Sequence, residues 1–388
     1  MLFGRMAERA GIEHRYSYLN PAADSDATST SAYDFYRRGD FPTTAARMRL
    51  FESQAPALAA AAVEKLLLGT ERERLTHILI TCCTGFSAPG LDLEIIARCR
   101  LPSSMERTMI GFMGCYAAIN ALKLARHIVR SEPNSRVLVL NLELCSLHLQ
   151  ETTNLDKILS FLIFGDGCAA ALVTADPIGF AMDSFCALLV PDTPDLITWA
   201  IGDSGFNMVL SGQVPGTILD AVREKSGQIL NGAPISAIDL WAVHPGGRSV
   251  LDAVERALDL KPSALGPSRD ILRRFGNMSS ASVMFVLESM LASPKAGALG
   301  CAMSFGPGLI AETMLFHAGS GLIGSRLLWA IGCNGVTRHD ALVSVRAGFR
   351  GRELSELWPS NDDWRLQEGP ALPFTHCFLA QRAGEMAP

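Results

Sequence analysis

The sequence predicts a layered α/β fold, and two patterns indicate it. Apolar runs rich in valine, isoleucine and leucine lack the alternation of a half-exposed strand, which is typical of strands covered on both faces. Stretches with helical periodicity lie between these runs, separated by turns that carry glycine and proline. Because strands that alternate with helices form sheets flanked by helical layers, we expect such layers around a buried core.

The elements expected from these patterns follow one another along the chain. The apolar runs predict strands over residues 77–81, 136–141, 168–173 and 239–243. The helical periodicity predicts helices over residues 44–68, 116–129, 214–229, 248–257 and 279–291. Two halves repeat one plan, in which a strand and a loop with small residues lead to a helix that begins after a polar residue. That residue is Cys115 in the first half and Asn277 in the second, so the pattern predicts a duplicated architecture.

Length and charge exclude several classes of protein. At roughly 100 to 200 residues per domain, the 388 residues allow two or three packed units with an ample core. Hydrophobic residues make up 48% and charged residues 19%, which is close to the globular average and excludes long-range disorder. The net charge of −5 provides no basic field, so we expect no nucleic-acid partner.

The sequence also predicts the compartment. No stretch approaches the roughly 18 apolar residues of a membrane-spanning helix, and the first residues are too charged for a secretory signal. We therefore expect a cytoplasmic protein without a membrane span. The ten cysteines are scattered without a C-x-x-C pair, which argues against a zinc site and against a disulfide framework. The open question is whether one of them is a nucleophile.

Cys115 is the first candidate for a functional residue. It lies between a strand-like segment and a helix, where unpaired N–H groups and the helix dipole favour an anion. This placement is expected to lower the pKa of the thiol. The alternative is a structural cysteine. Which of the two applies depends on the residues that accompany Cys115 in the site.

His244 and Asn277 are the candidate partners. His244 follows an apolar run and precedes two glycines, which places it at the carboxyl end of a strand, where α/β sheets form ligand crevices. The alternative is a core histidine whose ring nitrogens are hydrogen-bonded. Asn277 precedes a helix, and its neutral amide suits the stabilisation of an oxyanion or enolate. The alternative is a helix N-cap, a position that asparagine fills well.

The C-terminal part differs in character from the rest. Residues 317–388 are richer in arginine and tryptophan and show weak periodicity, so we interpret them as an extension without catalytic residues. Residues 319–324 match the pattern G-x-G-x-x-G, but no convincing strand–helix–strand unit with an acidic residue follows. A nicotinamide dinucleotide site is therefore not expected.

Cysteine, histidine and asparagine in this order, each at the boundary of an element and each near glycines, resemble the site of thiolase-fold condensing enzymes. More narrowly, the sequence resembles the type III polyketide synthases of the chalcone synthase superfamily over residues 5–316. The segments that carry the resemblance are Thr84-Gly-Phe-Ser-Ala-Pro-Gly90, Met113-Gly-Cys-Tyr-Ala-Ala118, Phe164-Gly-Asp-Gly167, His244-Pro-Gly-Gly247, Gly276-Asn-Met-Ser-Ser-Ala281 and Ser304-Phe-Gly-Pro-Gly308.

The resemblance implies a thiolase-like duplicated fold with the layers α/β/α/β/α. An N-terminal half over residues 1–176 would carry the cysteine, a C-terminal half over residues 177–316 would carry the histidine and the asparagine, and residues 317–388 would have no family counterpart. The sequence also departs from the family, because the family's first strand and helix are missing and Ser304 stands where a glycine is usual.

The resemblance further implies an acyltransferase whose nucleophile is Cys115. His244 would hold Cys115 as a thiolate and, with Asn277, bind the thioester carbonyl of malonyl-CoA as carbon dioxide leaves. No metal and no redox cofactor is implied, and the partners would be acyl-CoA, malonyl-CoA and a second copy of the chain. A carboxylate in the pocket would repel the enolate.

Pocket residues follow from the same resemblance. Phe164 and Phe206 fall on phenylalanines that gate the passage between CoA tunnel and cavity, with ordinary core packing as the alternative. Cys83, Cys145 and His148 fall where the family lines its cavity and sets starter choice.

Arg5 and Arg9 align with basic residues that grip CoA phosphates, with plain surface charges as the alternative. Residues 141–150 and the segment around Cys115 are most like bacterial members that make alkylresorcinols and alkylpyrones from long fatty acyl starters. An apolar tunnel would bind such a chain with about 0.8 kcal/mol per buried methylene.

Two other functions remain open from the sequence. A β-ketoacyl synthase of fatty-acid initiation has the same three residues, but carries out one condensation with a carrier-protein donor. An inactive, truncated remnant would keep the three residues without forming a working enzyme.

Overall fold

The computed structural model describes residues 7–19, 35–36, 39–66, 69–291, 297–319, 364–371 and 375–382. The chain divides into two compact units. The larger unit holds the described residues up to 317 except 177–179 and 297, and the smaller unit holds the rest. The smaller unit contains an antiparallel pair of strands, β11 (Trp364–Ala371) and β12 (Thr375–Arg382), which the weak periodicity of this segment did not predict.

Two four-stranded sheets form the centre of the larger unit. The first has the strand order β2-β1-β3-β4, and the second has the order β5-β10-β9-β8. In both sheets a parallel pair, β1/β3 or β8/β9, is extended by an antiparallel strand, β4 or β10. The strands are β1 (His77–Cys82), β2 (Glu106–Gly111), β3 (Val137–Leu144), β4 (Asp166–Val173), β5 (Phe180–Leu189), β8 (Leu240–Val243), β9 (Leu299–Gly306) and β10 (Ile310–Ala318).

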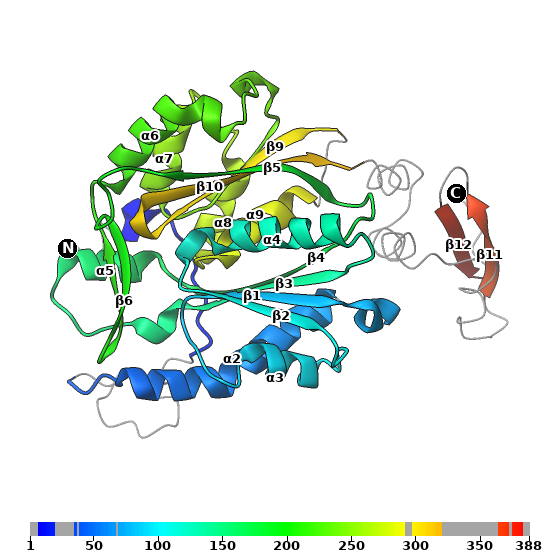
Figure 1. Ribbon diagram of the computed structural model, residues 1–388, viewed down its shortest axis with the longest axis horizontal. Helices are drawn as coiled ribbons and strands as arrows, with labels where there is room; N and C mark the ends of the chain where they lie inside the picture. Colours follow the sequence, from blue (N-terminus) through cyan, green and yellow to red (C-terminus); the bar gives the residue numbers. More distant parts are fainter. Residues whose placement is uncertain are drawn as a thin grey trace. The chain divides into compact units, whose positions relative to one another are not determined.

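Helices cover both sheets, so that helical and sheet layers alternate (Figure 1). Helices lie between the sheets, on the outer face of the first sheet and on the outer face of the second. The inner pair is α4 (Ala117–Ser131) and α9 (Ala281–Leu291), and the outer pairs are α2 (Thr44–Leu66) with α3 (Leu91–Arg98) and α6 (Val214–Ile229) with α7 (Arg248–Ala257). This order of layers is the expected α/β/α/β/α arrangement.

The central strands show why their sequences lack the alternation of polar and apolar residues. Successive residues of β1 face opposite layers, because Leu79 packs in the cluster between the sheets while Ile78 and Ile80 pack against α2. In β8, Ala242 faces the inner layer and Trp241 faces the outer helices. Burial on both faces removes the alternation of a half-exposed strand, and the prediction of doubly covered strands is confirmed here.

Several elements were not predicted, and exposure is the reason for β2. This strand is at the edge of its sheet, and Glu106, Arg107 and Thr108 are exposed, so its sequence carries no apolar run. Other elements without a prediction include α3, β5 and β9. They also include α5 (Leu155–Ile163), α8 (Gly266–Phe275) and the antiparallel pair β6 (Ile197–Gly202) and β7 (Gly205–Leu210). In the part of the chain that the structure describes, no helix has the length and apolar character needed to cross a membrane.

Candidate active site

The loop that carries Cys115 leads from the edge strand β2 into the inner helix α4. Cys115 lies in the 3-10 turn η2 (Gly114–Tyr116), directly before the first residue of α4. Gly114 has φ +74°, and a Cβ atom at this position would lie 2.3 Å from Cδ of Pro307. Its amide donates a hydrogen bond to Sγ of Cys83 at 3.0 Å. A glycine is therefore required to bring the cysteine against the end of β9.

The surroundings of Cys115 raise the pKa of its thiol. Burial is the main cause and brings the pKa to about 12, and the carboxyl group of Glu143 adds to the rise. Hydrogen bonds with the side chains of Ser279 and Asn277 act in the opposite direction. The prediction of a lowered pKa is wrong for this structure, because the loss of hydration at a buried sulfur outweighs the helix terminus.

His244 follows β8 and is buried, with its backbone amide bonded to the carbonyl of Met303 at 2.7 Å. Neither Nδ1 nor Nε2 has a hydrogen-bond partner among the described residues. Burial lowers the pKa of the imidazole to about 3, so the ring is neutral. The alternative of a hydrogen-bonded core histidine is therefore wrong, and two free polar atoms in a buried ring indicate a site that a ligand completes.

Asn277 connects the segments that carry His244 and Cys115. Its Nδ2 donates to the carbonyl of Gly246 at 3.2 Å, within the turn that follows His244. Its side chain also reaches the thiol of Cys115. Its Oδ1 accepts the amide of Ser279 at 2.8 Å, and α9 begins only at residue 281, so Asn277 closes a local turn and is not an N-cap.

These contacts bring the three candidate catalytic residues together from three separate segments. Asn277 touches both the thiol and the turn after His244, although the three residues are far apart in the chain. A sulfur nucleophile, an imidazole and a neutral amide in one place can transfer an acyl group and stabilise an enolate.

The two predicted gating phenylalanines also lie at this place. Phe164 ends α5 and forms a parallel bridge with Asn277, whose backbone bonds to the residues on both sides of it. Phe206 is buried in β7, and its ring centroid lies 5.5 Å from that of Phe112, three residues before Cys115. Phe164 thus adjoins Asn277, and Phe206 adjoins the loop that carries Cys115.

The predicted cavity residues differ in how they are placed. Cys83 contacts the loop of Cys115, and Cys145 begins the 3-10 turn η3 (Cys145–His148) after β3. Burial, together with the charge of Glu143, raises the pKa of both thiols well above the ordinary value. His148 is buried and both of its ring nitrogens are hydrogen-bonded to the protein, so it offers no free hydrogen-bonding group to a substrate.

The two predicted CoA contacts are not brought to the site by any described interaction. Arg5 lies outside the described residues. Arg9 is exposed in a short helical turn over residues 7–10, as expected of a surface charge or of a phosphate contact.

The sequence analysis missed Glu143, a fully buried carboxyl group beside Cys115. It accepts hydrogen bonds from the amide of Cys83 at 3.0 Å, from Oγ1 of Thr84 at 3.2 Å and from Oγ of Ser280 at 2.6 Å. Burial raises its pKa to about 7. Three donors satisfy this buried group, and its charge acts on the thiol of Cys115. A charged residue inside an otherwise apolar run was the signal in the sequence.

Glu143 predicts a dependence of stability on pH. The folded protein holds the proton to pH 7 or so, while the unfolded chain releases it near the ordinary value of 4.5. The protonated carboxyl group therefore stabilises the fold fully below pH 4.5. This contribution to the free energy of unfolding falls by about 3 kcal/mol as the pH rises from 4.5 to about 7. Glu143→Gln should remove this part of the loss, measured by denaturant unfolding at pH 4 and pH 8.

The matched control is Glu52→Gln on the exposed side of α2, which should keep the wild-type dependence. An equal loss of stability between the two pH values in wild type and Glu143→Gln would contradict the assignment.

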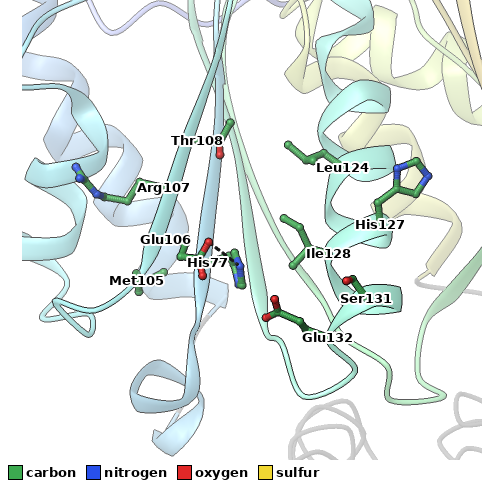
Figure 2. A pocket seen from close by; sticks show the side chains of 10 residues that line it. All are labelled: His77, Met105, Glu106, Arg107, Thr108, Leu124, His127, Ile128, Ser131 and Glu132. Atoms are coloured by element: carbon green, nitrogen blue, oxygen red, sulfur yellow. Dashed lines mark ion pairs between the residues drawn. The ribbon is translucent and has the colours of Figure 1, made fainter.

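One pocket of the described residues lies outside this site. It has a volume of about 530 Å³ and lies between β2 and α4. Figure 2 shows His77 and Glu106 among the residues that line it, with Nε2 of His77 3.6 Å from Oε2 of Glu106. None of the candidate catalytic residues lines it, so it is no candidate for the chemistry.

Comparison with known families matches both halves of the chain. Residues 2–177 match the N-terminal domain of the chalcone and stilbene synthases, and residues 181–319 match their C-terminal domain. One relative is the α-pyrone synthesis polyketide synthase-like Pks18 of Mycobacterium tuberculosis, 36% identical over 73% of this chain and 76% of the relative. Another is bisdemethoxycurcumin synthase of Oryza sativa, 32% identical over 82% of this chain and 83% of the relative.

Solved structures give the same result. The polyketide synthase PKS-I of the brown alga Ectocarpus siliculosus has a TM-score of 0.72 at 31% identity, covering 82% of this chain and 89% of that structure. The type III polyketide synthase domain of Steely1 from Dictyostelium has a TM-score of 0.73 at 26% identity, with the same coverage. The chain therefore belongs to the chalcone and stilbene synthase family and is a type III polyketide synthase, an acyltransferase.

Proposed function

We propose that this synthase loads a long-chain fatty acyl group from acyl-CoA onto Cys115, extends it with malonyl-CoA and cyclises the product to an alkylpyrone or alkylresorcinol. The observation that carries the proposal is the contact of Asn277 with both the Cys115 thiol and the turn after His244. The similarity to a relative named for α-pyrone synthesis supports the pyrone.

Loading is a thioester exchange. The sulfur of Cys115 attacks the thioester carbonyl of acyl-CoA, its proton passes to the imidazole of His244, and the CoA thiolate leaves and takes that proton. Burial keeps both groups neutral in this structure, with a thiol pKa near 12 and an imidazole pKa near 3, so the proton transfer accompanies the attack. A neutral imidazole with both nitrogens free suits this task.

Extension is a decarboxylative condensation. The side chains of His244 and Asn277 donate hydrogen bonds to the thioester carbonyl of malonyl-CoA, the bond to its carboxylate breaks, and carbon dioxide leaves. The enolate attacks the acyl carbonyl on Cys115, a carbon–carbon bond forms and the carbon–sulfur bond breaks. The thiolate is then free for the next round.

The remaining parts of the proposal concern access and assembly. Phe164 and Phe206 would gate the passage from the CoA side, Cys83 and Cys145 would line the cavity, and the enzyme would act as a homodimer without a metal or redox cofactor. The fold would divide into halves at residues 176 and 316, and Arg5 and Arg9 would contact the phosphates of CoA.

The test is incubation with a panel of acyl-CoA starters and ¹³C-labelled malonyl-CoA, followed by mass spectrometry of the products. We expect long-chain starters with two or more malonyl-derived units. A single unit, taken up only from a carrier protein, would favour the β-ketoacyl synthase, and an absent product together with a non-cooperative melt would favour the inactive remnant.

A further inference from the structure

Three buried or half-buried side chains fix the position of Phe206, two of them through ring contacts and one through the backbone beside His148. They are His148, Trp199 and Arg47, here called the Phe206 brace. Nε2 of His148 donates a hydrogen bond to the carbonyl of Thr84 at 2.7 Å, and Nδ1 accepts the backbone amide of Phe206 at 3.1 Å. One nitrogen donates and the other accepts, so these two bonds select the neutral Nε2–H tautomer. His148 thus ties the end of β1 to the start of β7.

The aromatic rings of the brace restrict Phe206 further. The ring of His148 is stacked on that of Phe206, with centroids 4.0 Å apart and 14° between the planes. Trp199 meets both rings edge-on at 5.5 and 5.8 Å. Its indole N–H donates to the carbonyl of Cys83 at 2.8 Å, next to the carbonyl that His148 holds. These contacts therefore fix the backbone of residues 83–84 and the ring of Phe206 relative to each other.

Arg47 fixes the backbone on both sides of His148. Its guanidinium is fully buried, and Nη1 donates to the carbonyls of Leu147 and Leu149 and to the hydroxyl of Tyr36. These carbonyls lie at the end of the short turn η3, where no intrahelical donor remains for them. A planar guanidinium with several donors can hold two carbonyls at once, which an ammonium group on a flexible stem does less well.

Two contacts join the brace to the loop of Cys115. Phe206 packs edge-on against Phe112, whose φ of +57° is unusual for a bulky residue. Sγ of Cys83 accepts the amide of Gly114, the residue before the nucleophile. A shift of the brace therefore moves a side chain and a backbone segment that adjoin the reacting atoms.

We propose that His148 and Arg47 are positioning residues for the condensation step, which act through Phe206 and do not contact the substrate. The proposal rests on the proposed function and changes the role of His148, which the sequence analysis placed in the cavity lining. Condensation must bring two carbon atoms into line, so misplacement of a neighbouring side chain by an ångström lowers its rate more than it lowers the rate of acyl transfer to the sulfur of Cys115.

The test is a double-mutant cycle with His148→Phe and Phe206→Leu. His148→Phe keeps a flat ring for stacking but removes both hydrogen bonds. We expect acyl loading of Cys115 to stay within about twofold of wild type, while the rate of condensation per loaded enzyme falls on the order of tenfold. In the Phe206→Leu background, His148→Phe should change the rate of condensation by less than about twofold, because the aromatic ring that His148 positions is absent there.

Counting rates per loaded Cys115 removes the effect of a lost folded fraction, so a merely structural role would leave the condensation rate unchanged. Arg47→Lys is the second variant and should show the same split between loading and condensation. His127→Phe, an exposed histidine on α4, is the matched control and should behave as wild type. If His148→Phe slows condensation equally with and without Phe206, or slows loading as much as condensation, the proposal is overturned. Wild-type enzyme that elongates no acyl-CoA would contradict the proposed function itself.

Discussion

Cys115→Ala is expected to abolish covalent acyl loading and to lower product formation by on the order of a thousandfold or more. The methyl group of alanine cannot form a thioester. Among the described residues, the thiol that the side chain of Asn277 contacts is that of Cys115. Because His244 and Asn277 remain, slow decarboxylation of malonyl-CoA should persist. Intact-protein mass after incubation with acyl-CoA, and product mass after addition of malonyl-CoA, measure the two effects.

The chain offers a matched control for this prediction. Cys186 is partly exposed in β5, away from the candidate site, and Cys186→Ala should load and extend as wild type does. Polyketide formation by Cys115→Ala at a rate within tenfold of wild type would remove the cysteine from the mechanism.

His244→Ala and Asn277→Ala should retain part of the acyl loading but stop decarboxylation. Both side chains would stabilise the developing enolate through hydrogen bonds, and removal of one such donor costs about 100- to 1,000-fold in rate. Asn277 takes no part in the proton transfer proposed for loading, so Asn277→Ala should load nearly as wild type does. His244→Ala also loses the group that accepts the thiol proton, so its loading should fall further while part of it remains. Release of labelled carbon dioxide from malonyl-CoA, compared with acyl labelling of Cys115, separates the two steps.

Asn277→Asp provides a finer variant of the same test. It keeps an oxygen that can accept the amide of Ser279, so the local turn should form, but it removes the Nδ2 donor. A folded Asn277→Asp protein should therefore also lose decarboxylation. Unchanged carbon dioxide release in this variant would assign the donor role to another group.

The elements that the sequence predicted are helices with one buried face and strands that are buried on both faces, because each of these gives a regular pattern of apolar residues. Helices α6 and α7 begin and end at the expected residues, and β1 and β3 are largely apolar and buried at every position because both faces are covered. The edge strand β2 was missed because exposed positions there carry polar residues. The pair β6 and β7 was missed because partly exposed strands lack a continuous apolar run.

In the candidate site too, features that depend on a local motif could be predicted and features that depend on burial could not. The resemblance located Cys115, His244 and Asn277 because their motifs are local in sequence. The direction of the thiol pKa and the effect of Glu143 on it depend on burial by segments distant in the chain, which no local motif contains. The tied ring of His148 likewise depends on partners at Thr84 and Phe206.

The most direct test of the account follows one turnover on isolated acyl-enzyme. Wild-type protein loaded with a fatty acyl group is freed of acyl-CoA, mixed with ¹³C-labelled malonyl-CoA and sampled over time by mass spectrometry. The account predicts that the acyl mass on the peptide containing Cys115 decays as one carbon dioxide and a β-ketoacyl thioester two carbons longer appear at the same rate. An acyl group that resides on another residue, or that is released by hydrolysis without elongation, would contradict it.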